Sequence, residues 1–523
     1  MLSDQGQLPD DTVSLKQIIA SQQMRIDELQ EMVRLLKNEI FGRKSEARLF
    51  IHPHQEQLFP PPEEPEPFTP DETIEVKGHA RQKRGRKPLP KDLPRKDVVH
   101  DIRDEEKKCA CGAELCRIGE DTSEKLDYIP AKIRVIRHIR PKYACKQCEG
   151  VEDDGPTVKI APVPVQLIPK SIATEGLLAH IAVSKFADAL PLYRQQKIFG
   201  RLKVDLSRAT MSNWLIQAAE SCAPVIDLLQ HEIRSGPLIH IDESPFQVFK
   251  EPGRSNTSKS YMWVFCGGSP TAPVALYRYR PTRSGDVVRD ILANYQGYVQ
   301  SDGYSGYDHL SRTPGITHMG CLAHARRKFI EVNKGRKKTR GKKKAAMGLA
   351  DEALEYIGEL YRIEKYAREK KFSFDRIREL RQTKSKPILD RFKMWIDAHH
   401  PQVPPKSLLG KAIQYTLNQW ERLVVYIEEG YLKPDNNVAE NAIRPFVLGR
   451  KNWLFSGAPK GADASATFFT LIETAKSNGL EPYAYLRYLF EQLPVAQTEA
   501  DYLNLLPSRI DQSKITSAAA VWG

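Results

Sequence analysis

Three acidic residues, far apart in the sequence, have the surroundings that metal-dependent phosphodiester chemistry requires. Asp242 lies inside the apolar run GPLIHIDESPFQVF, Asp302 ends the run GYVQSD, and Glu440 follows NNVA in a polar segment. A phosphodiester repels hydroxide, and two metal ions roughly 4 Å apart overcome this by activating the attacking water and neutralising the leaving oxygen. Because Mg²⁺ (or Mn²⁺) prefers carboxylate oxygens, we expect Asp242 to bind both ions, Asp302 one and Glu440 the other.

Each acid also has a simpler interpretation. Glu440 and Asn437 have the N-x-x-E spacing of a helix start, where both side chains cap free backbone N–H groups. Asp302 precedes a glycine, which is common in turns. Glu243 points to the opposite face of the strand from Asp242, so we expect it to stay outside the site. An acid buried in a strand is costly unless it is paired or metal-bound, which favours the metal interpretation of Asp242.

The elements that must position these acids are predicted to form an RNase H-like α/β domain over residues 235–330 and 426–475. The chain shows three strand patterns, a helix pattern and a fourth strand, at 236–249, 260–268, 274–280, 284–295 and 297–302. In an RNase H-like fold the first and fourth strands lie side by side, and a later helix brings the third acid to them.

Residues 331–425 interrupt this domain with helical patterns and predict an all-helical insertion. The insertion carries GRKKTRGKKK at 335–344, which either touches DNA with an affinity that falls steeply with salt or is a solvated loop. Residues 476–523 form a C-terminal segment and tail, in which 480–494 have the pattern of an amphipathic helix.

Residues 160–234 are predicted to be helical, with a helix-turn-helix-like arrangement around 190–220. A break centred on Gly200 separates two helices, and Ser207 is a suitable N-cap for the second. Arg208 and Asn213 would then face a DNA groove or phosphates. Any pair of packed helices gives the same pattern, so structural packing is the alternative.

Closely spaced cysteines predict a zinc-binding ribbon at 101–155. Four thiolates can hold tetrahedral Zn²⁺, which a small ribbon with few apolar residues needs in order to fold. Unligated thiols and a redox pair are the alternatives. The predicted ligands are Cys109, Cys111, Cys145 and Cys148, with Cys116 as a substitute for one of them.

The N-terminal part contains a heptad pattern followed by a linker. Apolar residues recur at alternating spacings of four and three within 13–46, which predicts a coiled coil, or else one amphipathic helix docked on the body. Residues 47–100 are a proline-rich and basic linker. Its RGRKP core is similar to a minor-groove arm called an AT-hook, in which Arg84, Arg86 and Lys87 contact DNA, or it is a solvated linker.

Composition limits the class of protein. The chain has 523 residues, a net charge of +13 and 41% hydrophobic residues, so we expect a multidomain α+β protein with polyanionic partners, nucleic acid first. No apolar run is long enough to span a bilayer and the N-terminus is polar. Eight cysteines with one close-spaced set suit a reducing cytoplasm better than a secreted disulfide framework.

The segments IHIDESPFQV, VQSDGYSGY, CLAHARRKF and NNVAENAIRPFVLGRKNWLFSG resemble the DDE transposases of bacterial insertion sequences, of the TnpC type in the insertion sequence sixty-six family. The resemblance extends from about residue 15 to 490. It implies that Asp242, Asp302 and Glu440 are the catalytic acids, with two Mg²⁺ or Mn²⁺ ions per active site. It also implies that Cys321 and His324 form a structural clasp near the site, which orients the insertion and is not a zinc site.

One position departs from the pattern of many DDE enzymes. They carry Lys or Arg seven residues after the glutamate, where this chain has Val447. Arg444 lies one helical turn after Glu440 and is our candidate for the phosphate contact. With it, Arg450, Lys451 and Trp453 are expected to hold the transposon end.

The resemblance implies a bacterial cytoplasmic, nucleoid-associated transposase without membrane contact. It would bind terminal inverted repeats through its N-terminal modules, cut to free a 3′-OH and join that end to target DNA. The heptads suit a homodimer or higher oligomer, and small companion proteins encoded by the same element are further expected partners. The alternatives are a metal-dependent nuclease without strand joining and a transposase-derived zinc-containing DNA-binding regulator.

Overall fold

The computed structural model describes residues 162–334 and 348–511, together with 133, 135–144, 158–160, 513–515 and six positions between 16 and 29. The zinc cysteines, the RGRKP arm and the basic run 335–344 lie outside the described residues. The six N-terminal positions are helical and include Ile19, Ile26 and Leu29, whose side chains are exposed. None of the described helices has the length and apolarity needed to cross a membrane.

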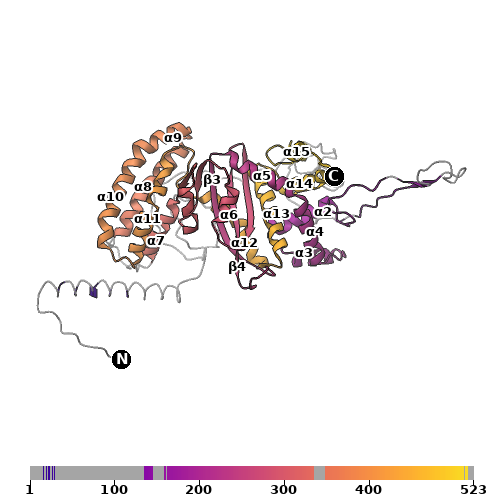
Figure 1. The fold of residues 1–523 in the computed structure, drawn as a ribbon, viewed down its shortest axis with the longest axis horizontal. Helices are drawn as coiled ribbons and strands as arrows, with labels where there is room; N and C mark the ends of the chain where they lie inside the picture. Colours follow the sequence, from indigo (N-terminus) through magenta and orange to yellow (C-terminus); the bar gives the residue numbers. More distant parts are fainter. Residues whose placement is uncertain are drawn as a thin grey trace, which may run out of the picture. The chain divides into compact units, whose positions relative to one another are not determined.

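A mixed sheet forms the centre of the region predicted to be RNase H-like, in the order β5-β4-β3-β6-β7 (Figure 1). Strand β4 is antiparallel to both β5 and β3, whereas β6 is parallel to β3 and β7 is parallel to β6. The predicted adjacency of the first and fourth strands is therefore confirmed, and the order is consistent with an RNase H-like core. The strands are β3 (Leu238–Val248), β4 (Lys259–Ser269), β5 (Ala272–Arg280), β6 (Gly297–Gln300) and β7 (Ile316–Met319).

Helices cover both faces of this sheet. Helix α12 (Asn437–Trp453) lies on one face, where Phe446 meets Phe246 of β3 with ring centroids 5.1 Å apart. The 3₁₀ segment η4 (Ser305–Arg312) lies on the other, where Tyr307 meets Trp263 of β4. Helix α13 (Pro459–Ser477) packs along β5, and the short strand β8 (Phe455–Ser456) extends the end of β3.

The helix expected at 284–295 is shorter than the pattern suggested. Helix α6 spans only Asp286–Ile291. The chain turns at Asn294, where φ is +61°, and β6 begins at Gly297. The apolar residues beyond α6, Leu292 and Tyr295, are buried although they are not helical, which explains why the pattern continues past the helix.

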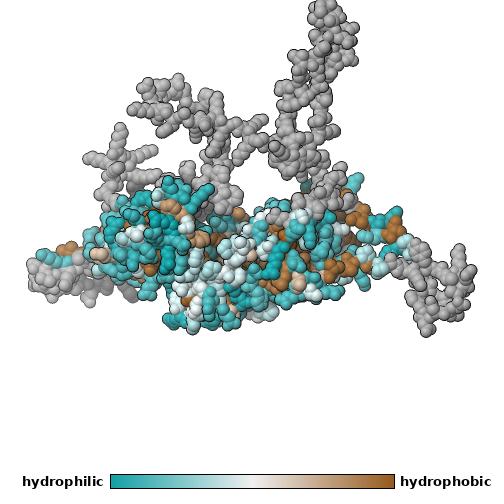
Figure 2. Space-filling model, turned by 90° about the horizontal axis from the view of Figure 1, so that it is seen from above, coloured by the Kyte–Doolittle hydropathy of each residue, from teal (hydrophilic) through white to brown (hydrophobic). Residues whose placement is uncertain are grey.

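The helices of the predicted insertion form, together with α7, a separate helical layer beside β7, shown on the left of Figure 1. Its core contains Phe329, Ile357, Phe392 and Ile413 and is distinct from the core around the sheet. In Figure 2, again on the left, these helices present mainly hydrophilic side chains. The helices are α7 (Leu322–Lys334), α8 (Leu349–Glu369), α9 (Phe374–Leu380), α10 (Lys386–His399) and α11 (Leu408–Val424).

The helices before the sheet and the C-terminal helices share one core with it. Helix α4 packs on α13, and α14 packs on α2 and α13, so residues 162–234 have no hydrophobic core of their own. The sequence segment 480–494 corresponds to α14. The helices are α2 (Glu175–Phe186), α3 (Leu192–Arg201), α4 (Arg208–Ser221), α5 (Ala223–Glu232), α14 (Pro482–Gln492) and α15 (Glu499–Leu503).

The α3–α4 junction differs in one detail from the sequence prediction. Gly200 lies within α3, and the chain turns at Lys203, where φ is +61°. The predicted N-cap of α4 is confirmed, because the Ser207 hydroxyl accepts a hydrogen bond from the Thr210 N–H at 3.0 Å.

Arg381 joins the insertion to the segment that leads into α12. It is 2% exposed and lies at the start of a π-helical turn, Arg381–Ser385. Its Nε and Nη2 donate to the two carboxylate oxygens of Glu364 at 2.8 and 2.7 Å. Its Nη atoms also donate to the carbonyls of Tyr426, Glu429 and Leu432 at 2.6–2.9 Å. These five bonds match the five donors of a guanidinium.

Replacing this guanidinium should weaken the insertion strongly. We expect Arg381→Lys to lower the free energy of unfolding by about 3 kcal/mol, because an ammonium cannot satisfy the half-buried Glu364 carboxylate and three carbonyls together. Urea unfolding followed by circular dichroism would measure this. Arg391→Lys is the matched control, since Arg391 pairs with Glu359 at the surface and should cost less than about 1 kcal/mol. Equal losses in the two variants would contradict the assigned role.

Candidate active site

The sheet register places two of the three predicted acids next to each other. His240 of β3 pairs with Gln300 of the parallel strand β6. Asp242 and Asp302 each lie two residues beyond that pair. Asp242 accepts a hydrogen bond from the Glu243 N–H, and Asp302 accepts one from the Tyr304 N–H, both at 2.9 Å. The two carboxylates therefore come from neighbouring chain segments at the same side of the sheet.

Glu440 reaches the site from the first turns of α12, where its side chain is 22% exposed. Two side chains of α7 approach its carboxylate. His324 Nδ1 lies 3.7 Å from Oε1, and Arg327 Nη2 lies 3.6 Å from Oε2. Within the described residues, Glu440 Oε1 and His324 Nδ1 are buried without a hydrogen-bond partner.

The start of α12 is set by Asn436, and the expected capping role of Asn437 is wrong. Asn436 occupies the N-cap position, is 1% exposed and makes no side-chain cap bond. Its Nδ2 donates to the Ile241 carbonyl at 2.8 Å, and its Oδ1 lies 3.1 Å from His240 Nδ1. Its backbone N–H donates to Cys321 Sγ at 3.2 Å. A local cap comes from Asp435, whose carboxylate accepts the Asn437 N–H at 3.3 Å. The contacts of Asn436 with β3 and with Cys321 add tertiary bonds that help to determine where the helix begins.

The charge balance of the site suits divalent cations. Burial, with added repulsion from Glu243, Glu440 and Asp302, raises the pKa of Asp242 to about 8. Burial lowers the pKa of the nearby His240 to about 4, so this imidazole contributes no positive charge at neutral pH. Three carboxylates with a deficit of positive charge, one with an unpartnered buried oxygen, are a donor set that fits Mg²⁺ or Mn²⁺.

Glu243 has structural partners of its own. It forms an ion pair with Arg283 and accepts a hydrogen bond from the Tyr307 hydroxyl, on the face of β3 opposite α12. The Arg283 guanidinium lies over the Tyr304 ring at 3.5 Å and is 4.0 Å from Asp302. Arg283 thus lies between Glu243, which is outside the candidate site, and Asp302, which belongs to it.

Sequence reasoning missed two cations beside the acids. Nothing in the local sequence distinguishes Arg283, because its partners Glu243 and Asp302 are distant in the chain. Arg327 had a weak signal, since it follows His324 by one helical turn and must share its face of α7.

Cys321 is 1% exposed, and burial raises the pKa of its thiol to about 12. Ligand atoms of Cys321, His324 and Glu440 lie within 4.8 Å of one another.

The basic end of α12 is divided between surface and interior. Arg444 and Lys451 are exposed, and Arg450 is half-buried, which lowers its pKa. Trp453 packs inward, with Lys185 Nζ 4.2 Å from its ring centroid and Phe186 at its edge, and this differs from the expected contact with DNA.

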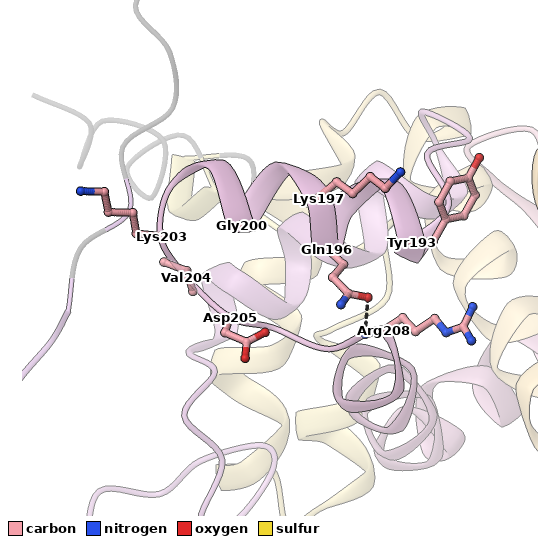
Figure 3. A pocket seen from close by; sticks show the side chains of 8 residues that line it. All are labelled: Tyr193, Gln196, Lys197, Gly200, Lys203, Val204, Asp205 and Arg208. Atoms are coloured by element: carbon pink, nitrogen blue, oxygen red, sulfur yellow. Dashed lines mark hydrogen bonds between the residues drawn. The ribbon is translucent and has the colours of Figure 1, made fainter.

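A groove separates α3 from the start of α4 (Figure 3). It has a volume of about 580 Å³ and is lined by Lys197, Lys203 and Arg208, with Asp205 as its acid. The Arg208 N–H donates to Gln196 across the groove at 3.3 Å. Arg208 and Asn213 are both exposed on α4, as the helix-turn-helix prediction requires.

Comparison with known families gives four consecutive matches along the chain. The models and the residues matched are "Transposase C of IS166 homeodomain" at 28–98, "zinc-finger binding domain of transposase IS66" at 106–149, "Transposase IS66 family" at 170–464 and "IS66 C-terminal element" at 470–508.

Relatives in Sinorhizobium fredii align with most of the chain. The chain is 34% identical to the protein y4jD, over 98% of this chain and 99% of the relative. It is 33% identical to y4qI, over 93% and 90%, and 31% identical to y4hP, over 79% and 75%. The similarity therefore includes the N-terminal modules as well as the region around the sheet.

The raised pKa of Asp242 predicts how stability depends on pH without divalent cations. The folded pKa of about 8 exceeds the unfolded value of about 4, so the folded state binds more protons between these values and loses stability as pH rises through them. Asp242→Asn should therefore be more stable than wild type at pH 8, on the order of 2 kcal/mol, and the difference should shrink at pH 5. Thermal unfolding without added Mg²⁺ would test this.

The matched control is Asp286→Asn, because Asp286 is an exposed acid of the same domain. Its stability relative to wild type should change much less between pH 5 and 8. A pH-independent difference between Asp242→Asn and wild type would contradict the burial of this carboxylate charge.

Proposed function

The chain belongs to the IS66 family of DDE transposases, and we propose that it cuts DNA at the ends of an insertion sequence and joins the freed ends to target DNA. Membership implies DNA transposition and DNA binding. The DDE domain implies divalent metal ions, and the zinc-finger match implies zinc. The recognition of inverted repeats and the strand-transfer steps are our proposal.

We infer that Asp242, Asp302 and Glu440 hold the metal ions. The observation that carries this proposal is the register of β3 and β6, which puts Asp242 and Asp302 on neighbouring chain segments. In addition, repulsion from Glu440 and Asp302 contributes to the raised pKa of the buried Asp242. Bound divalent ions would activate the attacking hydroxyl and stabilise the leaving oxygen. Water is the first nucleophile and frees a 3′-OH, and that 3′-OH attacks target DNA without a covalent protein–DNA intermediate.

Other residues of the chain support this chemistry by position and charge. Arg283 neutralises Glu243, which leaves the site with three acids rather than four. Exposed Arg327 and Arg444 flank Glu440 and are suited to contact the phosphate, which compensates for the uncharged Val447. Arg450 and Lys451 extend the basic surface of α12 toward the transposon end.

We propose that the N-terminal modules bind the element ends. Cys109, Cys111, Cys145 and Cys148 would hold zinc, with Cys116 as the alternative ligand. The arm at Arg84, Arg86 and Lys87 would enter a minor groove. The family match at 28–98 begins within the predicted heptads of 13–46. Such heptads suit a homodimer that would hold two ends together.

The groove beside α4 supports a further DNA contact. Lys197, Lys203 and Arg208 line this groove (Figure 3), and Arg208 and Asn213 of α4 are exposed. Arg208 would contact a phosphate, and Asn213, farther along the helix, would face base edges.

A strand-cleavage assay tests the catalytic proposal. The substrate is an end-labelled duplex carrying the element's terminus and its flanking DNA, in Mg²⁺. Asp242→Asn, Asp302→Asn and Glu440→Gln should each lower cleavage by at least about 10³-fold while binding persists, because the acids act in chemistry rather than in DNA recognition. Asp286→Asn is the control and should cut like wild type.

The products distinguish the rival functions. A labelled 3′ end joined to target DNA supports transposition, whereas cleavage without a joined product supports a nuclease. Specific binding without cleavage in Mg²⁺ or Mn²⁺ supports a regulator. Normal cleavage by Glu440→Gln would remove Glu440 from the catalytic set.

Binding assays test the role of α4. Arg208→Gln should weaken binding to the element end and lower the slope of log affinity against log salt by about one. Asn213→Ala should reduce preference for that end over random DNA by roughly tenfold. Arg376→Gln is the control, because Arg376 is an exposed arginine of the insertion paired with Glu379. Unchanged affinity and salt slope in Arg208→Gln would exclude this surface.

A further inference from the structure

The Cys-x-x-His motif connects two helices of the candidate active site. Cys321, just before α7, accepts the Asn436 N–H just before α12. The Leu322 N–H also donates to the Pro434 carbonyl at 2.8 Å. One turn farther along each helix, His324 faces Glu440. The cysteine therefore fixes the register between the helices, and the histidine occupies the position that this register brings to the acid.

His324 and Glu440 face each other without a direct hydrogen bond between them. A distance of 3.7 Å exceeds that of an ordinary hydrogen bond, which is about 2.7–3.2 Å. Both facing atoms, Nδ1 and Oε1, are buried without a hydrogen-bond partner among the described residues. Leaving such atoms unpaired is costly, so their arrangement calls for a third group between them.

A metal ion meets this requirement. Bonds of about 2.1 Å to nitrogen and oxygen allow two ligand atoms of one ion to lie up to about 4.2 Å apart. The observed 3.7 Å falls within this limit. Arg327 approaches the other carboxylate oxygen, Oε2, and so does not occupy the space between Oε1 and the imidazole.

We propose that His324 is a ligand of the metal ion that Glu440 holds, an inference that rests on the proposed catalytic role of Glu440. Cys321 acts as a positioning residue through its hydrogen bond to Asn436 and does not itself bind the ion. A nitrogen ligand favours transition metals over Mg²⁺. His324 should therefore raise the affinity of this position for Mn²⁺ relative to Mg²⁺.

Pulsed electron paramagnetic resonance of the full chain loaded with Mn²⁺ tests the proposal without a substitution. We expect a ¹⁴N coupling at the bound Mn²⁺, replaced by a ¹⁵N coupling in protein prepared with ¹⁵N-labelled histidine. His324→Gln should abolish the coupling and weaken Mn²⁺ binding by about tenfold. His231→Gln is the control and should change neither, because His231 is an exposed histidine on α5.

Two results would overturn the ligand role: Mn²⁺ bound in a Glu440-dependent manner without a histidine coupling, or a coupling that survives in His324→Gln. Failure of the proposed function would look different. In that case Glu440→Gln would bind Mn²⁺ and cut DNA like wild type, whatever the histidine signal.

Discussion

The buried amide of Asn436 is the interaction on which the candidate site depends. It joins the central strand, through Ile241 and His240, to the start of α7, through Cys321, and it begins the helix that carries Glu440. Gln300 adds a similar connection, since its Nε2 donates to the carbonyls of Gly320 and Lys433 at 3.0 and 2.9 Å. Each of these groups would be costly to bury without its partner. The segments that carry the acids are therefore held together by polar groups with directional bonds, which fix their positions more narrowly than apolar packing alone.

Electrostatic repulsion among the acids is a second constraint, and it opposes the hydrogen bonds that hold their segments together. The polar contacts bring Asp242, Asp302 and Glu440 together in a partly buried place where their charges repel, as the raised pKa of Asp242 records. Arg283 and Arg327 approach from the rim, and neither is fully buried. The fold thus tolerates an unfavourable charge arrangement, which bound cations would relieve. Stability and metal affinity are linked by this arrangement, because folding energy holds the acids in place before any ion binds.

The adjacency of the first and fourth strands, which puts Asp242 and Asp302 on neighbouring chain segments, could be predicted from sequence, because apolar runs and their order restrict the possible topologies. Local signals were less reliable where distant contacts decide. The N-cap of α12 is Asn436 rather than Asn437, and the Asn436 side chain donates a hydrogen bond to β3. The Trp453 ring packs on Lys185 and Phe186. The approach of His324 to Glu440 joins residues more than a hundred positions apart, and no periodicity encodes such a contact.

The position of α12 in the chain has a consequence for synthesis. The acid of β3 is made early, but α12, β8 and α13, which cover β3 and β5, are all encoded after the helical insertion. A nascent or truncated chain that ends before Asn436 leaves one face of the sheet, including Phe246, without its covering helices. The candidate site is therefore complete only late in translation, because a product interrupted before α12 lacks Glu440 and the helix that carries it.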